Sequence, residues 1–268
     1  MQIEIDGNVV QIATGGVTPT GQRPSVLLVH GAGGDRSVWQ LQTRFLAHHG
    51  FDAFAVDLPG HGLSGGELIS DIGSMVEWLA RVIGALEVGP AHVVGHSMGS
   101  LMTLELAANH PDLVRSAVLL GSAASMPVHP ALIESAENNT LLAPQLMTAW
   151  GYGTRSHVAG NPTPGMWMVG GGQALLERAS SGVIANDLKA CNEYIAPDEL
   201  AAHVTCPVTV LVGSDDRMTP PKAGAAVIAS LEAAGVQVTK VPLPGVGHTM
   251  MSEAPALVRS ALEAALNA

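Results

Sequence analysis

Residues 93–99 read Val-Val-Gly-His-Ser-Met-Gly, which places a Gly-x-Ser-x-Gly motif between an apolar, β-rich run and an apolar helical run. A serine on such a strand-to-helix turn presents its hydroxyl above the edge of a sheet. The two flanking glycines carry no side chains that would collide with the neighbouring backbone. We therefore predict that Ser97 is a nucleophile that attacks an acyl carbon.

A serine hydroxyl is a weak nucleophile near neutral pH, so it needs a base within hydrogen-bond reach. Of the 11 histidines, His248 is the strongest candidate, because it ends the loop Pro-Gly-Val-Gly-His that follows the last predicted strand. That loop opens at the carboxyl edge of the sheet, where Ser97 is also expected. We predict that His248 is the general base, and we interpret histidines such as His110 and His203 as helix-end or surface residues.

The base in turn needs a carboxylate that orients it. Residues 213–220 follow the preceding predicted strand and read Gly-Ser-Asp-Asp-Arg-Met-Thr-Pro, which offers two adjacent acids. We favour Asp216, because a loop that ends in Thr-Pro places the second acid deeper. Asp215 is then left for solvent or for capping the next helix, and the choice between the two acids stays open at this point.

A tetrahedral intermediate at Ser97 would need two backbone N–H donors for its oxyanion. Met98 begins the helix after the serine and supplies one of them. Ala32 is expected to supply the other, because residues 29–34 read Val-His-Gly-Ala-Gly-Gly after the first parallel strand. A phosphate-binding loop is the rival interpretation, but this spacing matches neither the dinucleotide fingerprint nor a P-loop.

The elements that must position these residues alternate between strands and helices. Apolar, β-rich runs occur at 2–5, 9–13, 26–29, 53–56, 92–94, 117–120, 208–212 and 238–241, and helical patterns occur at 72–86, 98–109, 221–234 and 255–266. The first two runs flank Asp6-Gly7 and predict an antiparallel hairpin. Continuous apolar strands are typical of a parallel sheet covered on both faces. We predict an α/β fold with a mostly parallel central sheet and helices on both faces.

Residues 125–205 interrupt this alternation. They contain short helical patterns without a convincing strand, and a structureless loop of that length is rare in a compact domain. We therefore predict a core domain formed by residues 1–124 and 206–268, with a helical insertion at 125–205. Four apolar side chains of the insertion either line a pocket or form its own core, namely Trp150, Met166, Trp167 and Met168.

With these residues in place, the chain resembles the α/β-hydrolase superfamily, in particular its bacterial serine esterases, lactonases, carbon–carbon bond hydrolases and cofactor-free perhydrolases. The resemblance covers about residues 20–125 and 205–268. It is carried by His30-Gly31, by Asp57-Leu-Pro-Gly-His-Gly-Leu-Ser64, by residues 95–99, by residues 213–216 and by Gly247-His248.

The resemblance implies the α/β-hydrolase fold, with residues 125–205 as its cap or lid, and it matches the chain order Ser, Asp, His. That family has a second position for the acid after an earlier strand, but residues 121–125 contain no acid. Because haloalkane dehalogenases and epoxide hydrolases use an aspartate nucleophile, Ser97 argues against those reactions. For Asp57 and His61 we expect a structural role.

The function expected from these residues is hydrolysis of a small, largely apolar carboxylic ester or lactone through an acyl-enzyme at Ser97, as in carboxylesterases (EC 3.1.1). Neither a cofactor nor a metal is expected. Carbon–carbon bond hydrolysis and perhydrolysis are alternatives that would use the same triad. A slow-turnover, ligand-binding receptor is the non-enzymatic alternative.

The composition narrows the expected partners to a small-molecule substrate. The formal net charge is −11 and only 12 residues are Lys or Arg, which opposes binding to nucleic acid or to anionic membranes. Residues 1–6 lack the features of a secretory signal, and no run of about 18 apolar residues predicts a membrane span. We expect a cytoplasmic protein with two buried thiols, Cys191 and Cys206, and a homodimer stays open.

Overall fold

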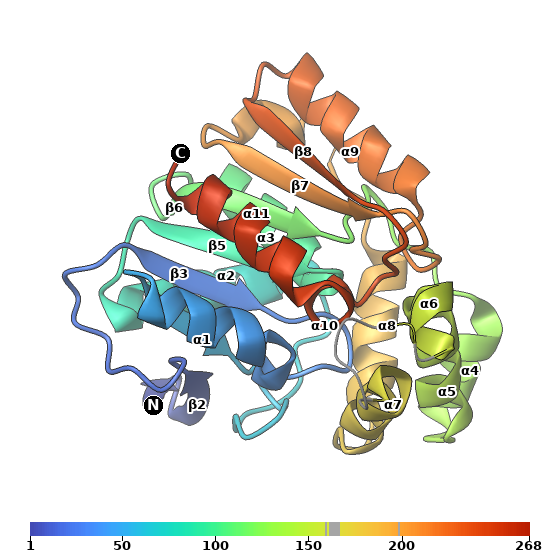
Figure 1. Ribbon diagram of the computed structural model, residues 1–268. Helices are drawn as coiled ribbons and strands as arrows, with labels where there is room; N and C mark the ends of the chain where they lie inside the picture. The colour runs from blue at the N-terminus through green and yellow to red at the C-terminus, as the bar shows by residue number, and fades with distance from the viewer. Residues whose placement is uncertain (159, 161–166, 198) are drawn as a thin grey trace.

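The computed structural model describes residues 1–158, 160, 167–197 and 199–268, which are built around an eight-stranded sheet (Figure 1). The strands are β1 Gln2–Ile5, β2 Asn8–Ala13, β3 Ser25–Val29, β4 Asp52–Val56, β5 Ala91–His96, β6 Val114–Leu120, β7 Val208–Gly213 and β8 Val238–Leu243. Their order in the sheet is β1-β2-β4-β3-β5-β6-β7-β8. The pairs β1–β2 and β2–β4 are antiparallel and the others are parallel, which confirms the predicted mostly parallel sheet.

The strands follow from the apolar runs and the turn residues of the sequence. Every residue of β3, β4 and β5 is buried, as parallel strands between two helical layers require. The opening hairpin turns at Asp6 and Gly7, which have φ angles of 52° and 75°. Both angles lie in the left-handed region that an Asp-Gly pair tolerates.

Helices cover both faces of the sheet. The alternating strand residues Leu27 and Val29 pack with α2 (Ile72–Leu86), α3 (Met98–Asn109) and α9 (Pro221–Ala233). Val26 and Leu28 point to the opposite face and pack with α1 (Gln40–His48) and α11 (Pro255–Leu266). Figure 1 shows α1 and α11 in front of the sheet. Ser97, between β5 and α3, therefore sits where a central strand meets a buried helix.

The regular elements described between β6 and β7 are helices, apart from an isolated antiparallel bridge between Ser125 and Ile195. This segment contains α4 Pro130–Glu137, α5 Leu142–Gly151, α6 Thr154–His157, α7 Met168–Glu177, α8 Val183–Glu193 and the 3₁₀ turn η2 Leu200–His203. Figure 1 shows α4 to α8 grouped beyond the carboxyl ends of the parallel strands. We refer to residues 125–205 as the insertion.

The helices in the described ranges are too short or too polar for any of them to cross a bilayer. Cys191 and Cys206 are both buried and unpaired with each other.

Candidate active site

Ser97 occupies a strained turn between β5 and α3. Its φ and ψ angles are 54° and −120°, a region that non-glycine residues rarely adopt and that costs about 1–3 kcal/mol. The Ser97 N–H donates to the carbonyl of Leu120 on the neighbouring strand at 2.9 Å, which holds the turn in place. Ser97 is half-buried, whereas His96 and Met98 on either side are buried. The turn thus presents the serine at the carboxyl edge of the sheet.

Close packing around the turn explains its glycines. A Cβ on Gly99 would lie 2.5 Å from the carbonyl oxygen of Val29, and a Cβ on Gly95 would collide with Gly99 and Thr103. A Cβ on Gly31 would lie 2.9 Å from the Cβ of Ser97, so the loop after β3 packs directly on the serine. These approaches are closer than a side chain permits, and they bring β3, β5 and α3 together at one point.

We expect Gly99→Ala to lower the free energy of unfolding by about 2 kcal/mol, because the added methyl group must displace the β3 backbone. Gly84→Ala is the matched control. Gly84 is exposed on α2 and its added Cβ would have no neighbour within 4 Å, so alanine should stabilise that helix by up to about 1 kcal/mol. Urea denaturation of both variants measures the difference. Equal stability of Gly99→Ala and the parent protein would contradict the close approach.

His248 lies in the loop after β8 and faces the same edge of the sheet. Its side chain is buried, and Nδ1 lies 2.8 Å from Oδ2 of Asp216. This contact leaves Nε2 as the nitrogen that can accept a proton. Within the described ranges, Ser97 Oγ and His248 Nε2 make no hydrogen bond to each other or to another residue. Catalytic hydrogen bonds of this kind often tighten only when substrate binds.

Asp216 is a buried carboxylate with a hydrogen bond to each oxygen. Oδ1 accepts from the N–H groups of Met218 at 2.9 Å and Thr219 at 2.8 Å, and Oδ2 accepts from the Thr219 hydroxyl at 2.7 Å. Burial by itself raises the pKa of Asp216, but the charge of His248 and these hydrogen bonds outweigh it and lower the pKa below its ordinary value. The carboxylate is therefore ionised beside the histidine at neutral pH.

The structure brings Asp216, and not Asp215, to His248. Asp215 is partly exposed and its Oδ1 accepts from the hydroxyl of Ser214 at 2.9 Å. The difference follows from the loop, whose backbone N–H groups converge on the second acid.

Two further residues, Thr219 and His96, also support His248. The Thr219 hydroxyl lies 3.1 Å from His248 Nδ1 while it donates to Asp216, so it fixes the angle between the two side chains. His96 Nε2 donates to the carbonyl oxygen of His248 at 2.9 Å. Burial and the neighbouring His248 lower the pKa of His96 to about 3, so this donor is neutral. The sequence could have indicated Thr219, because it lies three residues after Asp216. Nothing in the sequence indicated that His96 contacts the backbone of His248.

The two predicted oxyanion donors lie next to Ser97. Met98 begins α3, where backbone N–H groups are unpaired and the helix dipole favours negative charge. The Ala32 N–H belongs to the loop that Gly31 packs against the serine. Neither N–H has an acceptor among the residues that the structure describes. Both N–H groups are therefore free to donate, and their role as oxyanion donors stays a prediction.

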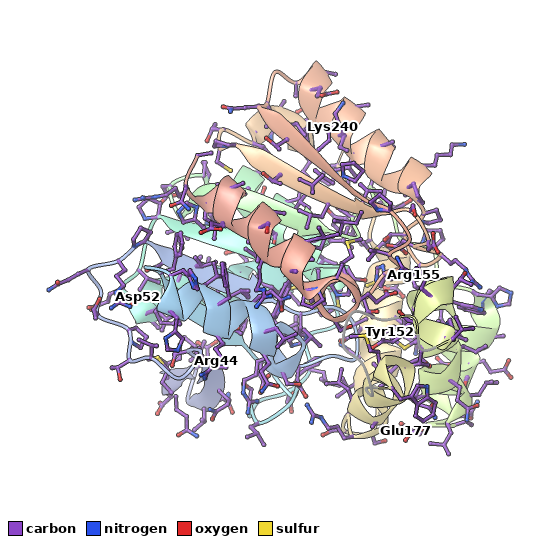
Figure 2. The ribbon with its side chains drawn as sticks, in the orientation of Figure 1. Arg44, Asp52, Tyr152, Arg155, Glu177 and Lys240 are labelled. Carbon is purple, nitrogen blue, oxygen red and sulfur yellow. The ribbon has the colours of Figure 1, made fainter. Side chains whose placement is uncertain are left out.

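The insertion contacts the His248 loop directly. The His248 N–H donates to the carbonyl of Gly151 at 2.6 Å, and the Gly153 N–H donates to the buried carboxylate of Glu253 at 2.8 Å. Figure 2 shows Tyr152 and Arg155 of this turn on the side of the insertion next to α10 (Met250–Glu253). The position of the histidine therefore depends on the insertion as well as on the core.

The apolar residues singled out in the insertion differ in their surroundings. Trp150 packs against the insertion's own core, and Met168 is buried with Tyr152. Trp167 is 72% exposed. Met166 lies outside the described residues.

We refer to residues 30–34, which follow β3 and contain the predicted donor Ala32, as the oxyanion loop. A cavity of about 410 Å³ lies beside this loop, and its lining includes Gly33, Arg36, His61, Leu175 and Arg178. Ser97, Asp216 and His248 are not part of that lining. Both arginines are paired with carboxylates, Arg36 with Asp57 and Arg178 with Asp35. In the described part of the chain, no group of three or more His, Cys, Asp or Glu side chains is placed to hold a metal ion.

Comparison with known families gives a match over most of the chain. A model of the Alpha/beta hydrolase family matches residues 26–261, a range that contains Ser97, Asp216 and His248.

Curated relatives include hydrolases with different substrates. (E)-2-((N-methylformamido)methylene)succinate hydrolase of Acinetobacter baylyi is 38% identical over 104 residues, which are 38% of this chain and 39% of that protein. The match thus spans about two fifths of that relative's length. Pimeloyl-[acyl-carrier protein] methyl ester esterase of Neisseria meningitidis is 32% identical over 215 residues, which are 74% of this chain and 77% of that protein.

Solved structures with the same fold include the enol-lactonase from Burkholderia xenovorans. Its TM-score is 0.84, and the comparison covers 100% of both chains at 19% sequence identity. At that identity the likeness shows the fold alone.

Proposed function

The chain belongs to the alpha/beta hydrolase family, and we propose that it is a serine hydrolase in which Ser97, His248 and Asp216 form the catalytic triad. One observation carries the proposal. The buried Asp216–His248 pair, joined at 2.8 Å, lies at the same sheet edge as the strained, partly exposed Ser97. A serine, a base and an orienting acid in that relation are what acyl transfer requires.

In the proposed reaction, the Ser97 oxygen forms a bond to the acyl carbon of the substrate while His248 Nε2 takes the serine proton. The N–H groups of Ala32 and Met98 stabilise the oxyanion of the tetrahedral intermediate. The intermediate then breaks its bond to the leaving oxygen, which receives the proton from His248. Water then gives a proton to His248 and attacks the acyl carbon. The bond from that carbon to the Ser97 oxygen breaks as His248 returns the proton to Ser97, which releases the acid. Asp216 remains ionised throughout and stabilises the protonated histidine.

The substrate class that fits best is a small, largely apolar carboxylic ester or lactone. The relative that matches three quarters of this chain is named as a methyl ester esterase. The side chains that the insertion packs on the oxyanion loop, Leu176 and Ile184, are apolar. In this proposal residues 125–205 form a cap over the site. Carbon–carbon bond hydrolysis or perhydrolysis would use the same three residues with another leaving group, or with peroxide in place of water.

A fluorophosphonate probe tests the nucleophile. We expect the folded protein to react at Ser97, because the probe's phosphorus mimics an acyl carbon and forms a stable bond to an activated serine oxygen. Peptide mass spectrometry should find the adduct on the peptide that contains Ser97. Protein unfolded in urea is the control and should stay unlabelled. Absence of labelling at Ser97 in the folded protein would contradict the proposal.

A panel of nitrophenyl esters with acyl chains of increasing length then tests the substrate class. We expect turnover of the short, uncharged esters. A protein that bound a small ligand tightly but turned over no ester would instead favour the receptor interpretation.

A further inference from the structure

Asp187, on α8 of the insertion, extends a fully buried carboxylate to the core of the protein. Its Oδ2 accepts a hydrogen bond from the N–H of Gly33 at 2.8 Å and another from Nε2 of His61 at 2.8 Å. Gly33 directly follows Ala32, whose N–H is the proposed oxyanion donor. One carboxylate oxygen therefore joins the insertion, the oxyanion loop and the loop after β4.

The N–H groups of Ala32 and Gly33, which are consecutive in the oxyanion loop, differ in their hydrogen bonding. Asp187 binds the N–H of Gly33, and the N–H of Ala32 is left without an acceptor among the described residues. Gly33 has a φ angle of 68°, and a Cβ there would lie 3.0 Å from Ile184 and 3.1 Å from Leu176 of the insertion. The insertion thus holds the loop at Gly33 through both a hydrogen bond and packing. The hydrogen bond and the packing at Gly33 therefore determine which N–H group of the loop faces Ser97.

A carboxylate bound to the N–H next to the proposed oxyanion donor would repel a developing oxyanion unless a positive charge compensates. His61 is placed to do so, because its side chain is 2% exposed and contacts Asp187 directly. Burial by itself lowers the pKa of His61, but the hydrogen bond and charge of Asp187 outweigh it and raise the pKa above its ordinary value. Below that raised pKa the two side chains form an ion pair with no net charge.

The other groups that face His61 do not oppose its positive charge. Nδ1 of His61 donates to the carbonyl of Pro59 at 2.9 Å. The ring of His30 lies 5.0 Å away, and burial and His61 lower the pKa of His30 to about 4, so it is neutral. Asp57 is paired with Arg36.

We propose that Asp187, paired with His61, is a positioning residue that sets the oxyanion loop, so that the insertion takes part in stabilising the transition state. The proposal rests on the proposed function, because it needs Ser97 as nucleophile and Ala32 as donor. Asp187 does not touch the substrate in this proposal and acts through the loop.

The test is Asp187→Asn, a substitution of nearly the same shape that can still accept from Gly33 but has no charge. A neutral amide oxygen accepts a weaker hydrogen bond than a carboxylate, so Gly33, and with it the Ala32 donor, should be held less firmly. We expect kcat for a nitrophenyl ester to fall by about 10–100-fold with KM changed less than about threefold, because a loosely placed donor is felt mainly in the transition state. Glu137→Gln is the control, since it removes an exposed carboxylate of the insertion that pairs with Lys189. Its kcat should match that of the parent protein.

The pH profile separates positioning from a merely structural effect. The pKa of His61 is raised in the folded protein, so the ion pair is present below that pKa and is lost as the pH rises through it. The kcat of the parent should therefore decline on the alkaline side, when the uncompensated Asp187 repels the oxyanion. In Asp187→Asn this decline should be absent.

His61→Gln supplies a second measurement if Asp187→Asn does not fold. Glutamine can still donate to Asp187 but carries no charge, so kcat should fall by about tenfold and the alkaline decline should disappear. Unchanged kcat and an unchanged pH profile in a folded variant would overturn the positioning role. If Ser97 of that variant still reacts with the fluorophosphonate probe, only the positioning role fails and the proposed function stands. If Ser97 of the parent protein does not react, the proposed function itself fails.

Discussion

Ser97→Ala should lower kcat for ester hydrolysis by up to about 10⁶-fold, since loss of a serine nucleophile removes the covalent route altogether. Alanine retains the backbone of the turn, and its side chain occupies the place of the serine Cβ. KM should change little, because the hydroxyl acts chiefly in the transition state. Steady-state kinetics with a nitrophenyl ester measure the loss, and near-ultraviolet circular dichroism checks the fold.

Ser122→Ala is the matched control for this loss. Ser122 is buried just after β6, next to Gly121, whose added Cβ would lie 2.9 Å from the ring of His248. Its hydroxyl has no hydrogen-bond partner among the described residues, so its removal should leave kcat within about threefold of the parent. Equal kcat values for Ser97→Ala and the parent would exclude Ser97 as nucleophile.

The sequence predicted the sheet well because its signals are local. Each buried strand is a short apolar run, and the Asp6-Gly7 turn has its own signature. Strand ends were less predictable. The run predicted at 92–94 is part of a strand that extends over Ala91–His96, because pairing with β6 continues through Gly95 and His96, whose types do not favour a strand.

The residues of the candidate site likewise differ in how well the sequence could predict them. Ser97, His248 and Asp216 follow the parallel strands β5, β8 and β7, so the order of strands along the chain was enough to predict that they lie at the same edge of the sheet. Asp187 could not be found from the sequence, because it is 154 residues from Gly33 along the chain. Within its own helix it resembles any polar residue. Only the packing of the insertion on the core shows that it is buried and what it binds.

Asp216→Asn should lower kcat by about 10⁴-fold, because it changes which nitrogen of His248 carries the proton. The N–H groups of Met218 and Thr219 bind Oδ1 of Asp216, so the asparagine oxygen should take that position and turn its NH₂ group toward His248. Nδ1 would then have to accept, which places the proton on Nε2. A histidine in that tautomer cannot take the proton of Ser97.

Asp215→Asn is the matched control, because it makes the same chemical change one residue earlier in the same loop. Asp215 is partly exposed and contacts the hydroxyl of Ser214. The kcat of Asp215→Asn should therefore stay within about threefold of the parent value. Steady-state kinetics of the two variants, measured at the same pH, decide between the acids. A large loss in Asp215→Asn with little loss in Asp216→Asn would reverse the assignment. A large loss in both would mean that the loop acts as a unit, and fluorophosphonate labelling rates would then show which substitution slows the attack by Ser97.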